Sequence, residues 1–319
     1  MPGRAAAGAR RPRVLLDCDT GIDDALALIY LAGRHLAGEL ELVGVTCTAG
    51  NTSAEQAARN SRFVLERCAP AQSSLRQVPI AAGCDVPLEV PLVTTPETHG
   101  ATGLGYLTAP TTAVGRDWRG VWDRAAARGS QLIVTGPATN LAAYGPWPGP
   151  VTLMGGAYEY PGNTTPTAEW NSWVDPHAAR LAFQEATHPI TVCSLGVTER
   201  FTINPERLSE LQEALGCAPV AELLPELLRF YFEFHRAQGE GYLAQIHDLL
   251  TCIIALGAVR YEHTLGEVDV ETRGERRGTT TASPGSAARI VSDADIAAVH
   301  EEALRAFRLL APAAAGSLG

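Results

Sequence analysis

Val14–Leu31 reads VLLDCDTGIDDALALIYL and places four aspartates between an apolar run typical of a strand and an Ala/Leu-rich run typical of a helix. Carboxylates this close in sequence repel one another and are costly to cluster unless a proton or a cation neutralises them. They also stand where a strand ends and the next helix begins, which is the usual ligand site of an open α/β sheet. The stretch therefore predicts an α/β fold that binds a hard, oxygen-preferring cation after its first strand.

The aspartate run has two other interpretations. Asp17-Cys18-Asp19-Thr20 is similar to the start of the haloacid-dehalogenase-like, Mg²⁺-dependent phosphatases, in which Asp17 would attack phosphorus and Asp19 would act as acid and base. Those enzymes also need a lysine, whereas all 25 basic residues of this chain are arginines, which replace a compact ammonium poorly. Acids at a helix N-terminus would favour the macrodipole, but that accounts for one or two aspartates and not for four.

The composition of the chain limits the possible partners. The 319 residues carry a net charge of −10, which argues against a nucleic-acid partner or an anionic membrane surface. No stretch approaches the roughly 18–20 apolar residues of a membrane span. The seven cysteines are scattered and never form a C-x-x-C pair, which is typical of a reduced, cytoplasmic protein rather than of a disulfide or zinc framework.

The two ends of the chain differ from its interior. Residues 1–12 are rich in arginine and alanine, and no apolar segment of a signal peptide follows them. We expect a disordered N-terminal tail over residues 1–12, one domain over 13–312, and a C-terminal tail over 313–319.

Strand-like runs alternate with helix-like runs through the whole domain. Strands are predicted over residues 14–16, 41–47, 79–83, 131–136, 151–156 and 190–193, and helices over residues 25–31, 53–66, 175–183, 223–235 and 249–256. This alternation predicts right-handed crossovers and an open, mostly parallel, Rossmann-like sheet flanked by helices. Residues 86–110 read as a long functional loop, and residues 273–285 as a hairpin tip or mobile loop.

Further polar residues follow the predicted strand ends, and in a parallel sheet these ends share one edge. They are Gly50-Asn51, Thr135-Gly136, Gly162-Asn163, Glu169-Trp170-Asn171 and His247-Asp248. Two carboxylates from the first loop, Asp248 and a backbone carbonyl would make an all-oxygen shell suited to Ca²⁺. Mg²⁺ would require a smaller octahedral shell with more waters.

With these motifs in this order, the chain resembles the calcium-dependent nucleoside N-ribohydrolases of the inosine–uridine-preferring type over roughly residues 14–310. The resemblance implies the nucleoside hydrolase fold and hydrolysis of ribonucleosides to ribose and free nucleobase by Ca²⁺-activated water, in nucleoside salvage. It also implies a small-molecule ribonucleoside as partner and a homo-oligomer, either a dimer or a tetramer.

The resemblance also implies roles for individual residues. The Ca²⁺ ligands would be Asp19, Asp24, the main-chain carbonyl of Thr135, and Asp248, and Asp19 would take the proton of the attacking water. His247 would face the nucleobase and is the candidate to hand it a proton. The substrate would be bound by Asp23, Asn51, Met154, Asn163, Glu169 and Asn171, with two further candidates, His99 in the long loop and Tyr242 near His247.

Such residues suit this reaction. Cleavage of an N-glycosidic bond develops positive charge on the ribosyl ring, and an anion-rich pocket stabilises that charge more than the neutral substrate. His247 favours the nonspecific or pyrimidine-leaning branch of the family. The remaining alternative is a catalytically silent protein that binds nucleosides or Ca²⁺.

Overall fold

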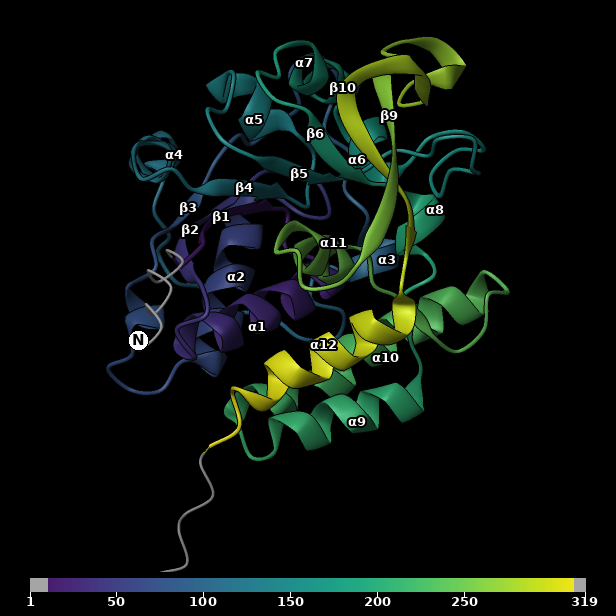
Figure 1. The fold of residues 1–319 in the computed structure, drawn as a ribbon. Coiled ribbons are helices and arrows are strands. Elements are labelled where there is room, and N and C mark those ends of the chain that lie inside the picture. The colour runs from purple at the N-terminus through teal and green to yellow at the C-terminus, as the bar shows by residue number, and fades with distance from the viewer. Residues whose placement is uncertain (1–10, 313–319) are drawn as a thin grey trace, which may run out of the picture.

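Eight strands form one sheet in the order β3-β2-β1-β4-β5-β6-β10-β9 in the computed structural model, which describes residues 11–312 (Figure 1). All neighbouring strands pair in parallel except β10 and β9. Two short strands, β7 and β8, pair separately. The bounds are β1 (Arg13–Cys18), β2 (Glu41–Cys47), β3 (Ile80–Ala82), β4 (Gln131–Val134), β5 (Val151–Met154), β6 (Ile190–Cys193), β7 (Thr202–Ile203), β8 (Ala244–Gln245), β9 (Tyr261–Val270) and β10 (Thr280–Ala294).

Helices cover both faces of the sheet, and a third helical layer lies outside one of them (Figure 1). One face carries α1 (Ile22–Leu36), α2 (Ala54–Cys68) and α11 (His247–Ala255), and the other carries α4 (Trp118–Ala127), α5 (Thr139–Tyr144) and α7 (Pro176–Gln184). The outer layer contains α9 (Pro205–Leu215), α10 (Leu224–Ala237) and α12 (Ile296–Arg308). The short helices are α3 (Pro96–His99), α6 (Trp170–Val174), α8 (Leu195–Thr198), η1 (Ser74–Gln77), η2 (Pro219–Leu223) and η3 (Gly274–Arg276).

The strand order places a crevice at the end of β1. The chain extends from β1 to β2 and β3 on one side and then returns to β4 on the other side. Asp17 near the end of β1 pairs with Val134, the last residue of β4. In open parallel sheets, ligands bind where the strand order reverses in this way. The aspartate run therefore follows the strand that borders the crevice.

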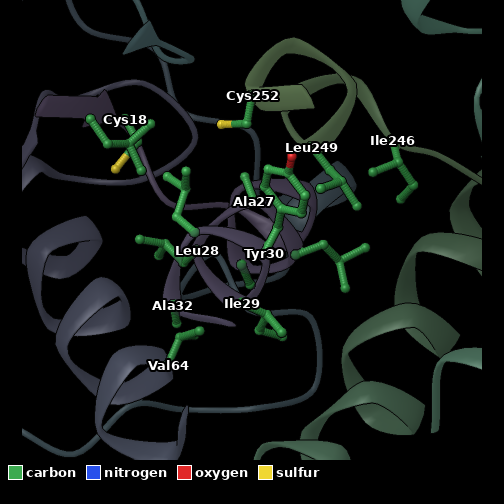
Figure 2. Close-up of a cluster of buried hydrophobic side chains, with 14 of the residues drawn as sticks. Cys18, Ala27, Leu28, Ile29, Tyr30, Ala32, Val64, Ile246, Leu249 and Cys252 are labelled. Carbon is green, nitrogen blue, oxygen red and sulfur yellow. The ribbon is translucent and has the colours of Figure 1, made fainter. Parts of the chain in front are cut away.

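Helix α1 is buried on every side, which fixes the position of its first turn. A helix that is apolar all round belongs in a core. Helix α1 lies between Cys18 of β1 and Val64 of α2 on one side and Leu249 and Cys252 of α11 on the other (Figure 2). Because the surrounding side chains hold this helix, Asp23 and Asp24 at its start have little freedom to move away from the crevice.

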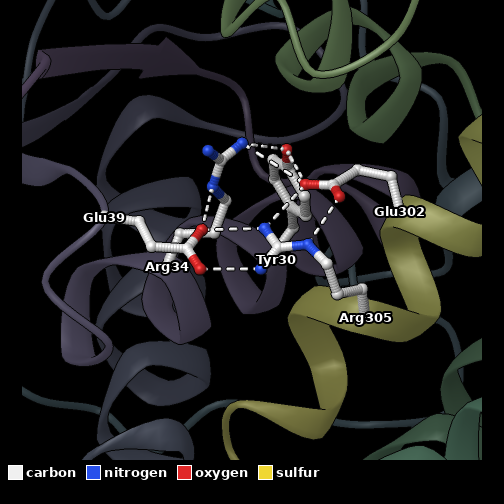
Figure 3. A network of polar contacts seen from close by, with 5 residues as sticks. All are labelled: Tyr30, Arg34, Glu39, Glu302 and Arg305. Atoms are coloured by element: carbon white, nitrogen blue, oxygen red, sulfur yellow. Dashed lines mark hydrogen bonds and ion pairs between the residues drawn. The ribbon is translucent and has the colours of Figure 1, made fainter.

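Polar contacts tie the other end of α1 to α12. Arg34 donates to the Tyr30 hydroxyl over 2.7 Å, and that hydroxyl donates to Glu302 over 3.0 Å (Figure 3). Arg305 donates to both carboxylate oxygens of Glu39 over 2.7 Å and to Glu302 over 2.7 Å. This network seats the last helix of the fold directly against α1.

Gly33 of α1 is the point of closest approach to α12. A Cβ atom added there would lie 2.4 Å from the Ala306 carbonyl oxygen. We expect Gly33→Ala to lower the free energy of unfolding by about 1–3 kcal/mol, because overpacking against backbone outweighs the gain in helix propensity. Urea unfolding measures this change in the free energy of unfolding. Ser209→Ala, at an exposed position in α9, is the control. An unchanged or raised midpoint for Gly33→Ala would contradict the close packing.

The structure confirms the predicted α/β sheet, its mostly parallel character and its single domain, and it differs from the expectations in detail. Asp23 and Asp24 lie in the first turn of α1 and not ahead of the helix, and Asn171 lies in α6. The long loop contains the single turn of α3, and residues 280–285 already belong to β10. The predicted tails lie outside the described residues except for residues 11 and 12.

Within the described part of the chain, no helix is long and apolar enough to cross a membrane.

Candidate active site

A cavity of about 540 Å³ opens at the crevice, a volume typical of sites for small molecules. It is lined by segments that follow β2, β4 and β5, together with the start of α11 and the inner side of α10. Ten residues predicted from the sequence line it: Asp23, Asn51, His99, Thr135, Met154, Asn163, Glu169, Asn171, His247 and Asp248. Asp19 and Asp24 are not among the lining residues, although they adjoin them.

A group of buried carboxylates stands at the floor of the cavity. Asp23, Asp24 and Asp248 each present an oxygen within 4.8 Å of the others. Burial, together with repulsion from Asp24, raises the pKa of Asp23 to about 7. Burial and the neighbouring aspartates also raise the pKa values of Asp19 and Asp248 well above the usual range. None of the described residues lining the cavity is an arginine, so protons or a cation must balance this charge.

Two of the aspartates are oriented by hydrogen bonds from the backbone and from one hydroxyl. Asp24 accepts from the Gly21 N–H over 2.8 Å and from the Thr135 hydroxyl over 2.7 Å. Asp19 accepts from the Asn51 N–H over 2.7 Å. A Cβ atom at Gly50 would lie 2.1 Å from Asp19 Oδ2, so only glycine allows the backbone this close to the carboxylate.

The donor set fits a hard cation. The Thr135 carbonyl oxygen accepts from Asn171 Nδ2 over 2.8 Å and keeps a second lone pair. Asn51 Oδ1 is buried without a hydrogen-bond partner among the described residues, and such an acceptor is costly unless a donor reaches it. Carboxylate and carbonyl oxygens without sulfur or imidazole are the ligands that Ca²⁺ and Mg²⁺ prefer.

Glu169 and its neighbours line a further part of the cavity. Glu169 caps α6 and accepts from the backbone N–H groups of Gly156, Asn171 and Ser172 over 2.7–3.0 Å. Burial raises the pKa of this carboxyl, and the three donors oppose that rise. Asn163 is exposed at the edge of the cavity, where its side chain accepts from the Trp170 N–H over 3.0 Å. The carboxylate is thus held by backbone donors rather than by a cationic side chain.

Asp17 connects structural elements that adjoin the site. It does not line the cavity, and it accepts from the Thr46 hydroxyl over 2.5 Å and from Asn140 Nδ2 over 2.8 Å. Burial raises its pKa to about 7. Both partners are side chains. Asp17 therefore links β1 to β2 and to α5.

Two predicted histidines are buried at the cavity. His99 accepts from the Ile22 N–H over 3.1 Å and thereby caps α1, so it is not a solvated loop residue. His247 shares a hydrogen bond of 2.8 Å with the Thr198 hydroxyl, and its backbone N–H donates to Asp23 over 3.3 Å. Burial lowers the pKa of both imidazoles to about 3.

The sequence missed one side of the cavity and misplaced one residue. Tyr231 and Phe234 of α10 line the cavity together with Tyr160, Glu199, His235 and Glu240. The four-residue spacing of Tyr231 and His235 on one helix was the available signal. Tyr242 does not line the cavity; it is 38% exposed and packs on Phe232 and Arg236.

Comparison with known sequences identifies relatives over most of the chain. The family model described as "Inosine-uridine preferring nucleoside hydrolase" matches residues 14–301. A pyrimidine-specific ribonucleoside hydrolase RihA from Shewanella sp. (strain MR-7) is 34% identical over 82% of this chain and 83% of its own length. The protein of the same name from Escherichia coli O9:H4 (strain HS) is 32% identical over 82% of this chain and 85% of its own.

Comparison with solved structures supports the fold. A plant nucleoside hydrolase superposes with a TM-score of 0.80 at 24% identity and covers 95% of this chain and 100% of its own. A purine-preferring ribonucleoside hydrolase from Gardnerella vaginalis also gives 0.80 at 24% identity, over 93% of this chain and 98% of its own. At this level of identity, the two superpositions establish the architecture alone.

Proposed function

Because the chain belongs to the inosine-uridine preferring nucleoside hydrolase family, and so hydrolyses the N-glycosidic bond of ribonucleosides, we propose that it does so with Ca²⁺ held at the crevice. The observation that carries this proposal is the group of buried carboxylates without a cationic partner. Asp19, Asp24, Asp248 and the Thr135 carbonyl would hold the ion, and Asp23 is close enough to contribute. The all-oxygen donor set supports a hard divalent cation, and Ca²⁺ tolerates its irregular geometry better than Mg²⁺.

The side chains divide the chemistry between them. When bound, the cation orients the sugar hydroxyls and makes water easier to deprotonate. Asp19 takes the proton of the attacking water, since the Asn51 N–H engages one of its oxygens and leaves the other available. The water oxygen then bonds to C1′ of the ribose as the bond from C1′ to the base breaks.

Residues from several parts of the cavity bind the ribose. We assign hydrogen bonds with the sugar to Asp23, Asn163, Glu169 and Asn171, an apolar contact to Met154, and a position near the attacking water to Asn51. His99 and His247 are placed beside the nucleobase. The carboxylates of the cavity stabilise the positive charge that develops on the ribosyl ring. Because they stabilise the transition state more than the neutral substrate, they lower the barrier of the reaction. These roles remain predictions that substitutions must test.

A panel of four nucleosides tests the proposed function directly. We expect release of reducing sugar from uridine and cytidine with a higher kcat/KM than from inosine and adenosine, because the sequence relatives are pyrimidine-specific enzymes. The measurement is a reducing-sugar assay on the four nucleosides. No sugar from any of them would overturn the function and favour a silent binding protein. A purine preference would overturn the base assignment alone.

A phosphatase is a poorer fit to this cavity. Transfer of a phosphoryl group needs cationic side chains around the phosphate oxygens. No arginine lines the cavity within the described chain, and the protein contains no lysine. Phosphate esters would therefore meet like charge from the carboxylates.

The family assignment also supports a proposal about the oligomeric state and the cellular compartment of the enzyme. We propose a homo-oligomer, a dimer or a tetramer, that works in the cytoplasm. All seven cysteines are free thiols, which suits a reducing compartment. Light scattering on the purified protein would give the number of chains in the assembly.

A further inference from the structure

The charged side chains that line the cavity are all carboxylates within the described chain. They are Asp23, Glu97, Glu169, Glu199, Glu240 and Asp248. A divalent cation at the crevice would offset two negative charges, and the group of buried aspartates there already carries more than two when ionised. The bound cation therefore leaves the carboxylates elsewhere in the cavity without a positive partner.

Two of these carboxylates, Glu199 and Glu240, lie near His247, which is assigned to the nucleobase. Glu199 follows Thr198, whose hydroxyl is 2.8 Å from the His247 ring. Burial and the nearby charge of Glu240 raise the pKa of Glu199. Within the described chain, neither carboxylate forms an ion pair with an arginine; Glu199 accepts from a tyrosine hydroxyl, and Glu240 contacts a histidine. We call Glu199 and Glu240 the base-end carboxylates.

The histidine beside Glu240 does not cancel its charge. His235 Nδ1 is 2.5 Å from the Glu240 carboxylate, and His235 Nε2 accepts the Gln245 N–H over 3.4 Å. A ring nitrogen that accepts a hydrogen bond carries no proton, so the single ring proton of His235 is on Nδ1 and the imidazole is neutral. Burial also lowers the pKa of His235, which favours the same neutral form. Glu240 therefore keeps its negative charge, and the ring only orients the carboxylate.

Aromatic rings accompany the base-end carboxylates. Tyr160, Tyr231 and Phe234 all line the cavity. Tyr160 donates to Glu199 over 2.8 Å, and the Tyr231 ring packs on the ring of His235, the partner of Glu240, with centroids 4.6 Å apart. A cation is attracted by the face of an aromatic ring as well as by a carboxylate. This part of the cavity is therefore complementary to a flat ring that carries a positive charge.

We propose that the cavity accepts, besides neutral nucleosides, ribonucleosides whose base carries a permanent positive charge, and that Glu199 and Glu240 select for that charge. The class includes pyrimidine nucleosides alkylated on N3, such as 3-methylcytidine, which is a cation at neutral pH. The inference rests on the proposed function and names a further substrate class for the same site. Glu199 and Glu240 are specificity residues in this proposal and take no part in the chemical step.

Hydrolysis of such a substrate balances without a proton donor for the base. As the bond between C1′ and N1 breaks, N1 keeps the electron pair, and this pair neutralises the positive charge of the base. The base therefore leaves as neutral 3-methylcytosine. Water adds its oxygen to C1′ and gives one proton to Asp19, which passes it to solvent. The products are ribose, the neutral base and one proton.

The test uses the full-length enzyme with Ca²⁺ and a matched pair of substrates. 3-Methylcytidine and 3-methyluridine share the sugar, the pyrimidine ring and the methyl group, but only 3-methylcytidine is charged. The measurement is the ratio of kcat/KM for 3-methylcytidine to kcat/KM for 3-methyluridine. A charged base is also the better leaving group on any enzyme, so the change of this ratio between wild type and variants reports on the carboxylates.

Removal of either base-end charge should lower that ratio. We expect Glu199→Gln and Glu240→Gln each to lower it about fivefold, and the double variant about tenfold or more, because each change removes one negative charge near the base and keeps an acceptor oxygen. Glu262→Gln, exposed on β9, should leave the ratio unchanged. An unchanged ratio in the double variant, with thermal unfolding showing that it folds, would overturn the role of the carboxylates.

His247→Asn supplies a second readout. A base that leaves without a proton has no need of a donor, so the loss of kcat on uridine should exceed the loss on 3-methylcytidine by about tenfold or more. Equal losses on both substrates would contradict departure of the charged base without a proton.

Turnover by the wild type separates this inference from the proposed function. Release of ribose from 3-methylcytidine as well as from uridine is the expected result. Release from uridine alone would overturn the further substrate class and leave the proposed function standing. Release from neither substrate would contradict the proposed function itself.

Discussion

Asp19→Asn is expected to lower kcat on ribonucleosides by about 10³-fold or more, with a much smaller change in the free energy of unfolding. The substitution is nearly isosteric and keeps an oxygen for the Asn51 N–H, which is 2.7 Å from the carboxylate in the wild type. It removes the proposed base, and loss of a general base alone costs about 10²–10⁴-fold. It also removes one negative charge from the proposed cation site, which adds to the loss.

Asp17→Asn is the matched control, two residues earlier in the chain and near the end of β1. Asp17 is fully buried, does not line the cavity, and is bound to Thr46 and Asn140. Asparagine can accept the same two hydrogen bonds, so kcat should stay within about tenfold of the wild type. Circular dichroism and thermal unfolding of both variants show whether each one folds. Wild-type turnover by folded Asp19→Asn would dismiss Asp19 as the base.

Removal of divalent cations is expected to abolish turnover, and Ca²⁺ should restore it. A ligand that binds only the folded state stabilises it by RT ln(1 + [L]/Kd), or about 2.7 kcal/mol at one hundred times Kd. The chelated protein should therefore also unfold at lower temperature. Dialysis against EGTA, metal analysis, and assays with Ca²⁺ and Mg²⁺ added back separately measure the effect and identify the ion. An enzyme fully active without stoichiometric metal would contradict the proposal.

The metal-free protein should also show a defined pH dependence. Burial raises the pKa of Asp23 from 3.8 to about 7 in the folded chain, whereas the unfolded chain titrates near pH 4. The folded state therefore binds more protons between these values. Its free energy of unfolding should be highest below about pH 4 and fall as the pH rises toward 7. Saturating Ca²⁺ should reduce this slope, because a cation replaces the proton in balancing the carboxylates. The same slope with and without Ca²⁺ would contradict that exchange.

The elements of the fold with strong local patterns were predictable. The strands over residues 41–47 and 190–193 match β2 and β6 to the residue, because β-branched runs between turn signals leave little choice. The helix starting at Asp175-Pro176 is confirmed, since an aspartate cap and a proline in the first turn mark a start. By contrast, the sequence suggested only the tip of the β9–β10 hairpin. Exposed residues along β9 give no continuous apolar signal, and pairing with β10 supplies the stabilisation.

The site was predictable where residues sit at strand ends, and poorly predictable on helices of the outer layer. Asp23 and Asn51 follow β1 and β2 at the common edge of the parallel sheet, and they line one cavity with Asp248 of α11, which follows β8 outside that sheet. The spacing of Tyr231 and His235 places them on one face of α10, but which face packs against that edge depends on tertiary contacts that the local pattern does not encode. Tyr242 is only five residues from His247, yet the chain turns between them and carries its ring outward.

The cap of α1 couples its first turn to a segment that lines the cavity. Gly21 has no side chain with which to cap that helix, and the acceptor for the Ile22 N–H comes instead from His99, 77 residues beyond Ile22. The segment that carries His99 also supplies Thr95, Glu97 and Thr98 to the rim of the cavity. A movement of this segment would break the bond to the Ile22 N–H and leave that amide without its acceptor beside Asp23. The position of this segment and the first turn of α1 are therefore linked through a single hydrogen bond.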